Sequence, residues 1–271
     1  MISVLSDMMS YTFIVRAMIV GGLVALCSAL LGVSLVLKRY SMIGDGLSHV
    51  AFAALTIAVA MNVAPLYIST PIVTVAAIIL LRLSENSKIK GDSAIALIST
   101  VSIAIGVVVT ALTKGMNTYV YSYMFGSILA MSESDVYMSI ALSVVVIILF
   151  VFFYNKIFAV TFDESFAKAT GTKADAYNMI IAVLTAITIV VGMRIMGTML
   201  ISSLIIFPAL ISMRNFKTFK SVIICSAIVS VVCFFLGIVL SYLYSIPTGA
   251  SIVLVNTVAL ILSYLIGELR N

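Results

Sequence analysis

The chain has 271 residues, of which 63% are hydrophobic and 9% charged, with 15 Lys and Arg against 10 Asp and Glu. Soluble domains carry about 25% charged residues, and a soluble fold of this length could not bury so much apolar surface. The composition therefore excludes a soluble enzyme or a nucleic-acid-binding protein and indicates a helical integral membrane protein, in which the formal net charge of +5 is a topology signal.

The apolar segments predict where the chain crosses the membrane, since a span needs about 20 apolar residues. Runs without Lys, Arg, Asp or Glu occur at Ala17–Leu37, Val50–Leu81, Ser93–Thr113, Gly115–Ser132, Val136–Asn155, Ala176–Met193, Ile195–Met213 and Ser221–Gly267. The second run is too long for one helix and is expected to break near Asn62 and Pro65; the last is expected to break near Ser245 and Pro247. Ten candidate segments result.

Basic residues help to choose among these segments, because cytoplasmic loops collect Lys and Arg. Twelve of the fifteen basic residues gather in clusters: Lys38, Arg39, Arg82, Lys88, Lys90, Lys156, Lys168, Lys173, Arg214, Lys217, Lys220 and Arg270. This pattern predicts one transmembrane domain over residues 1–271 with about nine crossings, within a range of eight to ten, an outside N-terminus and a cytoplasmic C-terminus. It leaves Arg16, Lys114 and Arg194 for the outer side. It also requires that Gly115–Ser132 does not cross but forms a short re-entrant or outer helix.

Asp45 and His49 carry the clearest chemical signal. His49 is the only histidine in the sequence, and Asp45 closely follows the basic pair Lys38–Arg39. Residues four apart share one face of a helix, with Cβ atoms about 6 Å apart, so a carboxylate oxygen and an imidazole nitrogen could reach one divalent cation. If the helix begins near Ser41, His49 lies about 12 Å along it, near the midplane of a hydrocarbon core about 30 Å thick. Ionisable groups at that depth usually line a pathway.

A structural alternative stays open for the same pair. Asp45 would cap the helix, as acidic residues near a helix start often do, and His49 would bond a neighbouring carbonyl. Under the metal hypothesis two ligands are too few for tight binding. A dimer-related copy or other helices must then complete the coordination shell.

The second informative stretch is FDESFAKATG, residues 162–171. Asp163 and Glu164 are placed to open a short helix, Lys168 follows Glu164 by four residues, and Gly171 is suited to the C-terminal cap. Apolar groups recur on one side, at Phe162, Phe166 and Ala169. A short amphipathic helix of this kind fits either a docking element for a soluble partner or an interfacial helix on lipid headgroups. The chain has no GxxxxGK[ST] loop, so any ATP hydrolysis requires another subunit.

Six segments form a familiar series in chain order. They are LKRYSMIGDGLSH at 37–49, GDSAIA at 91–96, YMFGSIL at 123–129, FDESFA at 162–167, GTMLISSLIIFP at 197–208 and TGASIVL at 248–254. In this order the segments resemble the permease subunits of bacterial manganese, zinc and iron ABC importers, the zinc/manganese-type ABC-3 family. The resemblance extends over nearly the whole chain.

The resemblance implies a homodimeric permease that works with two cytoplasmic ATP-binding subunits and an extracellular metal-binding lipoprotein or periplasmic protein. It implies that Asp45 and His49 form the translocation site. It assigns ATPase coupling to a cytoplasmic helix that includes Phe162, Asp163, Glu164, Phe166, Ala167, Lys168 and Gly171. The chain would be a non-catalytic subunit in the bacterial cytoplasmic membrane, without a permanent cofactor, that passes Mn²⁺, Zn²⁺ or Fe²⁺ by alternating access. One departure is Ala53-Ala54-Leu55, where relatives often have a glycine and a proline.

Three other functions predict different behaviour. An ion-gradient-driven cation transporter would work without an ATPase, and an ABC permease for a metal chelate would have a wider pathway that does not need Asp45. A receptor or scaffold would have no metal-dependent phenotype. One carboxylate and one imidazole suit manganese, zinc and ferrous iron alike, so the residues do not identify the metal.

Overall fold

The computed structural model describes residues 7–86, 91–113, 120, 124–126, 133–198 and 201–269. Its helices are α2 (Thr12–Leu37), α3 (Ser41–Ala60), α4 (Pro65–Asn86), α5 (Gly91–Leu112), α7 (Glu133–Phe152), α8 (Tyr154–Phe162), α9 (Glu164–Ala169), α10 (Ala174–Met196), α11 (Ile201–Asn215), α12 (Phe219–Tyr244) and α13 (Thr248–Leu269). Within these residues eight helices are long and apolar enough to cross a membrane, and α11 is a shorter apolar helix. The predicted helical membrane bundle, with eight to ten crossings, is therefore confirmed.

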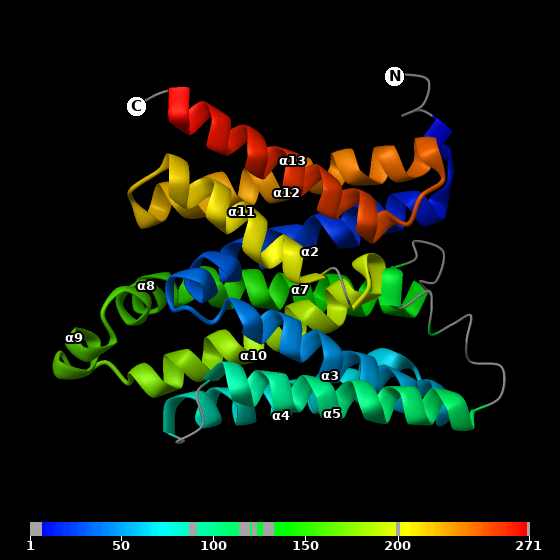
Figure 1. Cartoon of the computed structure of the whole chain (residues 1–271), viewed down its shortest axis with the longest axis horizontal. Helices are drawn as coiled ribbons and strands as arrows, with labels where there is room; N and C mark the ends of the chain where they lie inside the picture. Colours follow the sequence, from blue (N-terminus) through cyan, green and yellow to red (C-terminus); the bar gives the residue numbers. More distant parts are fainter. Residues whose placement is uncertain are drawn as a thin grey trace.

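The long helices alternate in direction between two ends of the bundle (Figure 1). The end of α5 and the start of α7 lie at the same end of the bundle. Arg16 near the start of α2 forms an ion pair with Glu133, which also places the starts of α2 and α7 together. The helix predicted over Gly115–Ser132 lies outside the described residues, except at positions 120 and 124–126.

Two expected breaks in the apolar runs are confirmed. Between α3 and α4 the chain turns at Asn62, which has a φ of 55°, and α4 then begins at Pro65. At the end of α12, Ser245 adopts the left-handed conformation with a φ of 52°, and its N–H bonds the carbonyl of Ser241. A left-handed residue ends a helix, and a proline is tolerated at the first helical position, so local chemistry divides both runs.

The expected division between the apolar runs on either side of Arg194 is present, but it lies three residues after Arg194. α10 continues through this residue to Met196, and the chain turns at Gly197, where φ is 84°. The side chain of Arg194 is 2% exposed and pairs with Asp135 of α7, Nη2 to Oδ2, at 2.5 Å. A buried partner of opposite charge removes the need for Arg194 to reach water, and a charge count along the sequence does not show such a partner.

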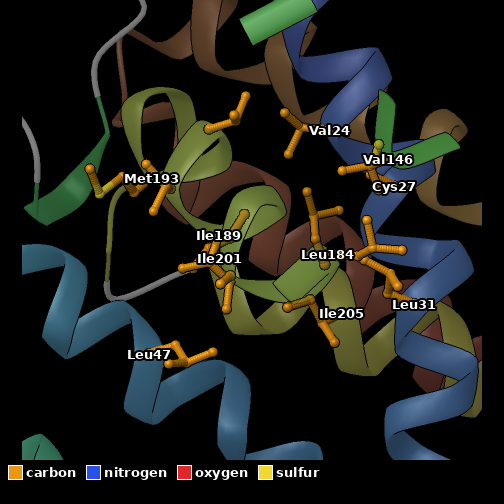
Figure 2. Packing of buried hydrophobic residues seen from close by; sticks show 14 of the residues in the cluster. Val24, Cys27, Leu31, Leu47, Val146, Leu184, Ile189, Met193, Ile201 and Ile205 are labelled. Atoms are coloured by element: carbon orange, nitrogen blue, oxygen red, sulfur yellow. The ribbon is translucent and has the colours of Figure 1, made fainter. Parts of the chain in front are cut away.

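The core lies along α2, α3 and α10. Of the most apolar 18-residue stretch in each helix, 72% is buried in α2 and α3 and 78% in α10, compared with 17% in α5. Side chains of α2, α10 and α11 meet there, including Leu31, Leu184 and Ile205 (Figure 2). α11 approaches α2 closely at Gly32, where an added Cβ would lie 2.1 Å from the carbonyl oxygen of Ile205. The small residue thus permits close helix contact, as membrane bundles require.

Candidate functional site

α3 places Asp45 and His49 on one helical face. The helix begins at Ser41 as expected, so its rise puts His49 about 12 Å from its first residue. His49 Nε2 lies 3.6 Å from Asp45 Oδ2, and the side chains are 17% and 39% exposed, respectively. The sequence spacing therefore correctly brings the two groups together, and neither is enclosed by the bundle.

The residues on either side of Asp45 show where this face points. An added Cβ at Gly44 would lie 3.3 Å from Ile205 of α11, whereas one at Gly46 would lie 2.8 Å from Ile95 of α5. Successive helical residues are about 100° apart. Asp45 consequently points between α5 and α11, away from the covered side of α3.

His49 lines a cavity of about 350 Å³. The wall is formed by α3, α5 and segments near the end of α10: His49, Phe52, Ile103, Val107, Thr110, Ala111, Val120, Met124 and Thr198. This wall is mainly apolar, with His49, Thr110 and Thr198 as its polar side chains. Such a space can pass a small ion only if a few polar groups replace water. Asp45 lies one helical turn from His49, just beyond the residues that line the cavity.

The capping alternative for Asp45 is wrong. Tyr40 is the N-cap of α3 and provides no side-chain cap, and the first turn contains no acidic residue. Asp45 is the fifth helical residue and faces His49. The helix also continues without a break through Ala53-Ala54-Leu55, so the departure from the family pattern does not divide α3.

The pair alone does not make a closed metal site. In the described part of the chain, no group of three or more His, Cys, Asp and Glu side chains is close enough to hold a metal ion. A carboxylate oxygen and a neutral imidazole are good ligands for divalent transition metals. Two such ligands with one open side suit a transient stop better than a permanent centre, which normally has at least three protein ligands.

The short helix predicted in residues 162–171 is confirmed as α9. Asp163 is its N-cap, and the Asp163 carboxylate accepts a hydrogen bond from the N–H of Phe166 at 2.9 Å. At the other end Gly171 has a φ of 80°, its N–H bonds the carbonyl of Lys168, and the N–H of Thr172 bonds that of Ala167. Both caps follow directly from local residue chemistry.

α9 has a buried side and an exposed side. Ala167 is 1% exposed and packs with Val160 and Ala174. Phe162 and Phe166 are 59% and 64% exposed. Phe166 of α9 and Phe162, the last residue of α8, therefore expose two large apolar side chains at the end of the bundle, where α9 projects at the left of Figure 1.

A polar network holds Glu164 on α9. Lys168 lies 3.0 Å from Glu164 Oε1 and 2.9 Å from Asp175, which confirms the predicted pair four residues apart. Lys38 Nζ lies 3.1 Å from Glu164 Oε2, and Asn178 donates to the same oxygen at 3.0 Å. Partial burial raises the pKa of Glu164, but the hydrogen bonds from Asn178, Lys168 and Lys38 outweigh it and lower the pKa to about 2.

Sequence reasoning missed Lys38 and Asn178 in this network. Lys38 precedes Glu164 by 126 residues and Asn178 follows it by 14. No local periodicity links positions so far apart, and the sequence signal of Lys38 was its charge near the end of a span. Thr110 and Thr198 of the cavity wall were missed for the same reason.

The fold and the site define a class of protein. The chain is a multi-pass helical membrane protein with an acid–imidazole pair beside a partly open cavity and a capped amphipathic helix projecting from one end. These are features of a transport permease, in which intramembrane ionisable groups line a substrate path.

The chain belongs to the ABC 3 transport family, whose model matches residues 10–267. It is 26% identical to the manganese transport system membrane protein MntC of Halalkalibacterium halodurans, over 95% of this chain and 88% of the relative. It is 28% identical to the high-affinity zinc uptake system membrane protein ZnuB of Haemophilus influenzae, over 91% of this chain and 95% of the relative. The solved structure of PsaBC from Streptococcus pneumoniae in complex with Fab matches with a TM-score of 0.88 and 26% identity, covering 97% of this chain and 95% of the other. The resemblance inferred from the sequence is confirmed.

Proposed function

We propose that the chain is the permease subunit of an ATP-driven importer for a divalent transition-metal ion. The observation that carries this proposal is the Asp45–His49 pair beside a cavity in a member of the ABC 3 transport family. Relatives named for manganese and zinc transport support a metal as the substrate. Manganese, zinc and ferrous iron all fit a carboxylate and an imidazole.

The proposed orientation places the end that holds α8, α9 and the α11–α12 turn in the cytoplasm (Figure 1). Four lysines lie at helix ends on this side of the bundle: Lys38, Lys156, Lys173 and Lys217. Cytoplasmic loops favour basic residues. The start of α2 is then outside and the end of α13 inside, in a bacterial cytoplasmic membrane.

The proposed partners follow from two incomplete features of the chain. Asp45 is partly exposed and has too few neighbouring ligands for a metal site, which supports a homodimer in which a second copy faces the path. The outward Phe162 and Phe166 support α9 as the contact for a cytoplasmic ATP-binding subunit, two per dimer. An extracellular metal-binding lipoprotein or periplasmic protein would deliver the ion.

In the proposed mechanism the two side chains replace part of the water shell of the ion. The Asp45 carboxylate supplies negative charge, and His49 supplies a neutral nitrogen lone pair, so metal competes with a proton at the imidazole. Ligands on one helix face release an ion more easily than a closed cage. ATP-driven movement at α9 would then change the side from which the pair is accessible.

Uptake by proteoliposomes tests this function. The permease is reconstituted with the ATP-binding subunit encoded beside it, and entry of Mn²⁺ and Zn²⁺ is measured with and without ATP. Uptake should require ATP, survive ionophores that collapse proton and sodium gradients, and stop when the ATPase carries a catalytic substitution. Uptake that persists without ATP and stops with ionophores would instead identify an ion-gradient-driven transporter. Uptake restricted to a metal chelate would identify a chelate permease.

Coupling through α9 has a separate test. Phe166→Ala should reduce co-purification of the ATP-binding subunit, because this exposed ring is the largest apolar group on α9. Leu112→Ala is the matched control, since Leu112 is 80% exposed and is the last residue of α5, which ends on the opposite side of the bundle from α9 (Figure 1). If the ATP-binding subunit co-purifies with both variants as well as it does with the wild type, α9 is not the docking helix.

A further inference from the structure

Lys38 lies at the corner between α2 and α3, the helix that carries Asp45 and His49. It is the C-cap of α2, and α3 begins three residues later at Ser41. Its side chain is only 8% exposed, whereas Lys156, Lys217 and Lys220 are exposed. A lysine that only marks the cytoplasmic side has no need of burial, and burying an ammonium group is costly unless it is paired.

The ammonium group of Lys38 closes a ring of three elements. It donates to Glu164 Oε2 of α9 at 3.1 Å and to Asn178 Oδ1 of α10. Asn178, which is 2% exposed, donates from Nδ2 to the same Glu164 oxygen at 3.0 Å. Charge-assisted hydrogen bonds in a partly buried site are strong and directional. α9 is thus tied to the α2–α3 corner as well as to its neighbour α10.

Backbone hydrogen bonds close the corner between α2 and α3. The N–H of Arg39 bonds the carbonyl of Val36, and the N–H of Tyr40 bonds that of Leu35, while Arg39 has a φ of 61°. These two bonds form the Schellman arrangement that closes a helix. The N–H of Ile43 then bonds the carbonyl of Tyr40, so the first turn of α3 begins directly on this closed corner.

The low pKa of Glu164 agrees with a permanently charged partner for Lys38. Lys168 holds the other carboxylate oxygen of Glu164 at 3.0 Å, which fixes the orientation of the group toward Lys38. Movement of α9 therefore acts on the α2–α3 corner through the Lys38–Glu164 ion pair. Asp45 lies in the next turn of α3, four residues after its first residue.

We propose that Lys38 is a positioning residue that transmits movement of α9, through Glu164 and Asn178, to the start of α3 and so to Asp45 and His49. This inference rests on the proposed function, because it assigns the route by which α9 acts on the ion path. Lys38 contacts neither metal nor nucleotide in this role. Its removal should leave ATPase binding intact and separate ATP hydrolysis from metal movement.

Lys38→Met tests the link, with Lys38→Arg as the conservative variant and Lys156→Met as the control on an exposed lysine. In the isolated permease, Lys38→Met should accelerate amide hydrogen exchange about tenfold in α9, because its charge-assisted bond to the α2–α3 corner is lost. Exchange in residues 41–46 should accelerate as well, because the corner on which α3 begins is then no longer tied to α9 and α10. Lys38→Arg should restore most of the protection. Unchanged exchange in residues 41–46 would overturn the link. Glu164→Gln, at a partly exposed position, gives the same comparison should Lys38→Met fail to fold.

The complete transporter gives the functional measurement. In the reconstituted complex, Lys38→Met should keep ATPase co-purification within about twofold of wild type, while metal moved per ATP hydrolysed falls about tenfold, within the usual range of coupling energies. Loss of ATPase binding together with uptake would overturn the proposal, since Lys38 would then only support the docking helix. A wild-type complex that moves no metal with ATP would refute the proposed function, while the exchange result would still decide the link.

Discussion

The buried ion pair between Arg194 and Asp135 provides a sharp test of the packing. Arg194→Met removes a charge that is 2% exposed and leaves the carboxylate of Asp135, itself 10% exposed, without its 2.5 Å partner. Removing one member of a buried pair costs about 3–5 kcal/mol. At about 2–4 °C per kcal/mol for a chain of this size, the melting temperature in detergent should fall by about 6–20 °C.

The chain carries its own reporter for this measurement. Cys27 and Cys233 are buried thiols, 1% and 4% exposed, so a thiol-reactive dye will report unfolding as temperature rises. Arg16→Met is the matched control at the same end of the bundle. Arg16 and Glu133 are 36% and 70% exposed, and an exposed pair contributes about 0–1 kcal/mol.

The single variant Asp135→Leu and the double variant Asp135→Leu/Arg194→Met complete the cycle. The double variant removes both charges and replaces them with apolar side chains, an exchange that is often close to neutral in a buried site. Its melting temperature should exceed that of Arg194→Met. A loss in Arg194→Met no larger than that in Arg16→Met would contradict a buried ion pair. A loss in the double variant equal to the sum of the losses in Asp135→Leu and Arg194→Met would contradict it as well.

Three further predictions concern α9 and the helix contacts. In the folded protein the pKa of Glu164 is lowered from 4.5 to about 2. The charged Glu164 therefore stabilises the folded protein above pH 4.5, and this stabilisation is lost as pH falls toward 2. In thermal melts, the stability difference between the wild type and Glu164→Gln should shrink over that pH range. Gly171→Ala meets no atom within 4 Å, so only its left-handed backbone is penalised, by about 1–2 kcal/mol; amide exchange in α9 should accelerate about 5–30-fold, and an unchanged rate would contradict the cap. Gly32→Ala should lower the melting temperature more than Gly22→Ala, since the added Cβ would lie 2.1 Å from a backbone oxygen at Gly32 but 3.6 Å from a side chain at Gly22; equal effects would contradict the close α2–α11 contact.

Local chemistry made several features of this fold predictable. Asn62 and Ser245 adopt positive φ values where the apolar runs were expected to divide. The caps of α9 use Asp163 and Gly171 as their residue types suggest. The spacing of Asp45 and His49 correctly placed both groups on one face, because helical periodicity alone determines it.

Features that depend on distant segments were not predictable. The sequence shows Arg194 only as a charge assigned to the outer side, and its pairing with Asp135, 59 residues earlier, appears only in the fold. The sequence likewise shows Lys38 only as a topology signal, because its partners on α9 and α10 come beside the α2–α3 corner only in the fold. The cavity beside His49 needs walls from α3, α5 and Thr198, and a single sequence contains no signal for that junction.

Metal uptake by variants of the pair tests the central claim most directly. Asp45→Asn and His49→Gln keep the size of each side chain but weaken or remove a ligand, so ATP-dependent uptake should fall by at least about tenfold with ATPase co-purification unchanged. Asp92→Asn, an exposed acid in the first turn of α5, should transport normally. Wild-type rates of metal uptake in both Asp45→Asn and His49→Gln would contradict the assignment of these residues to the ion path.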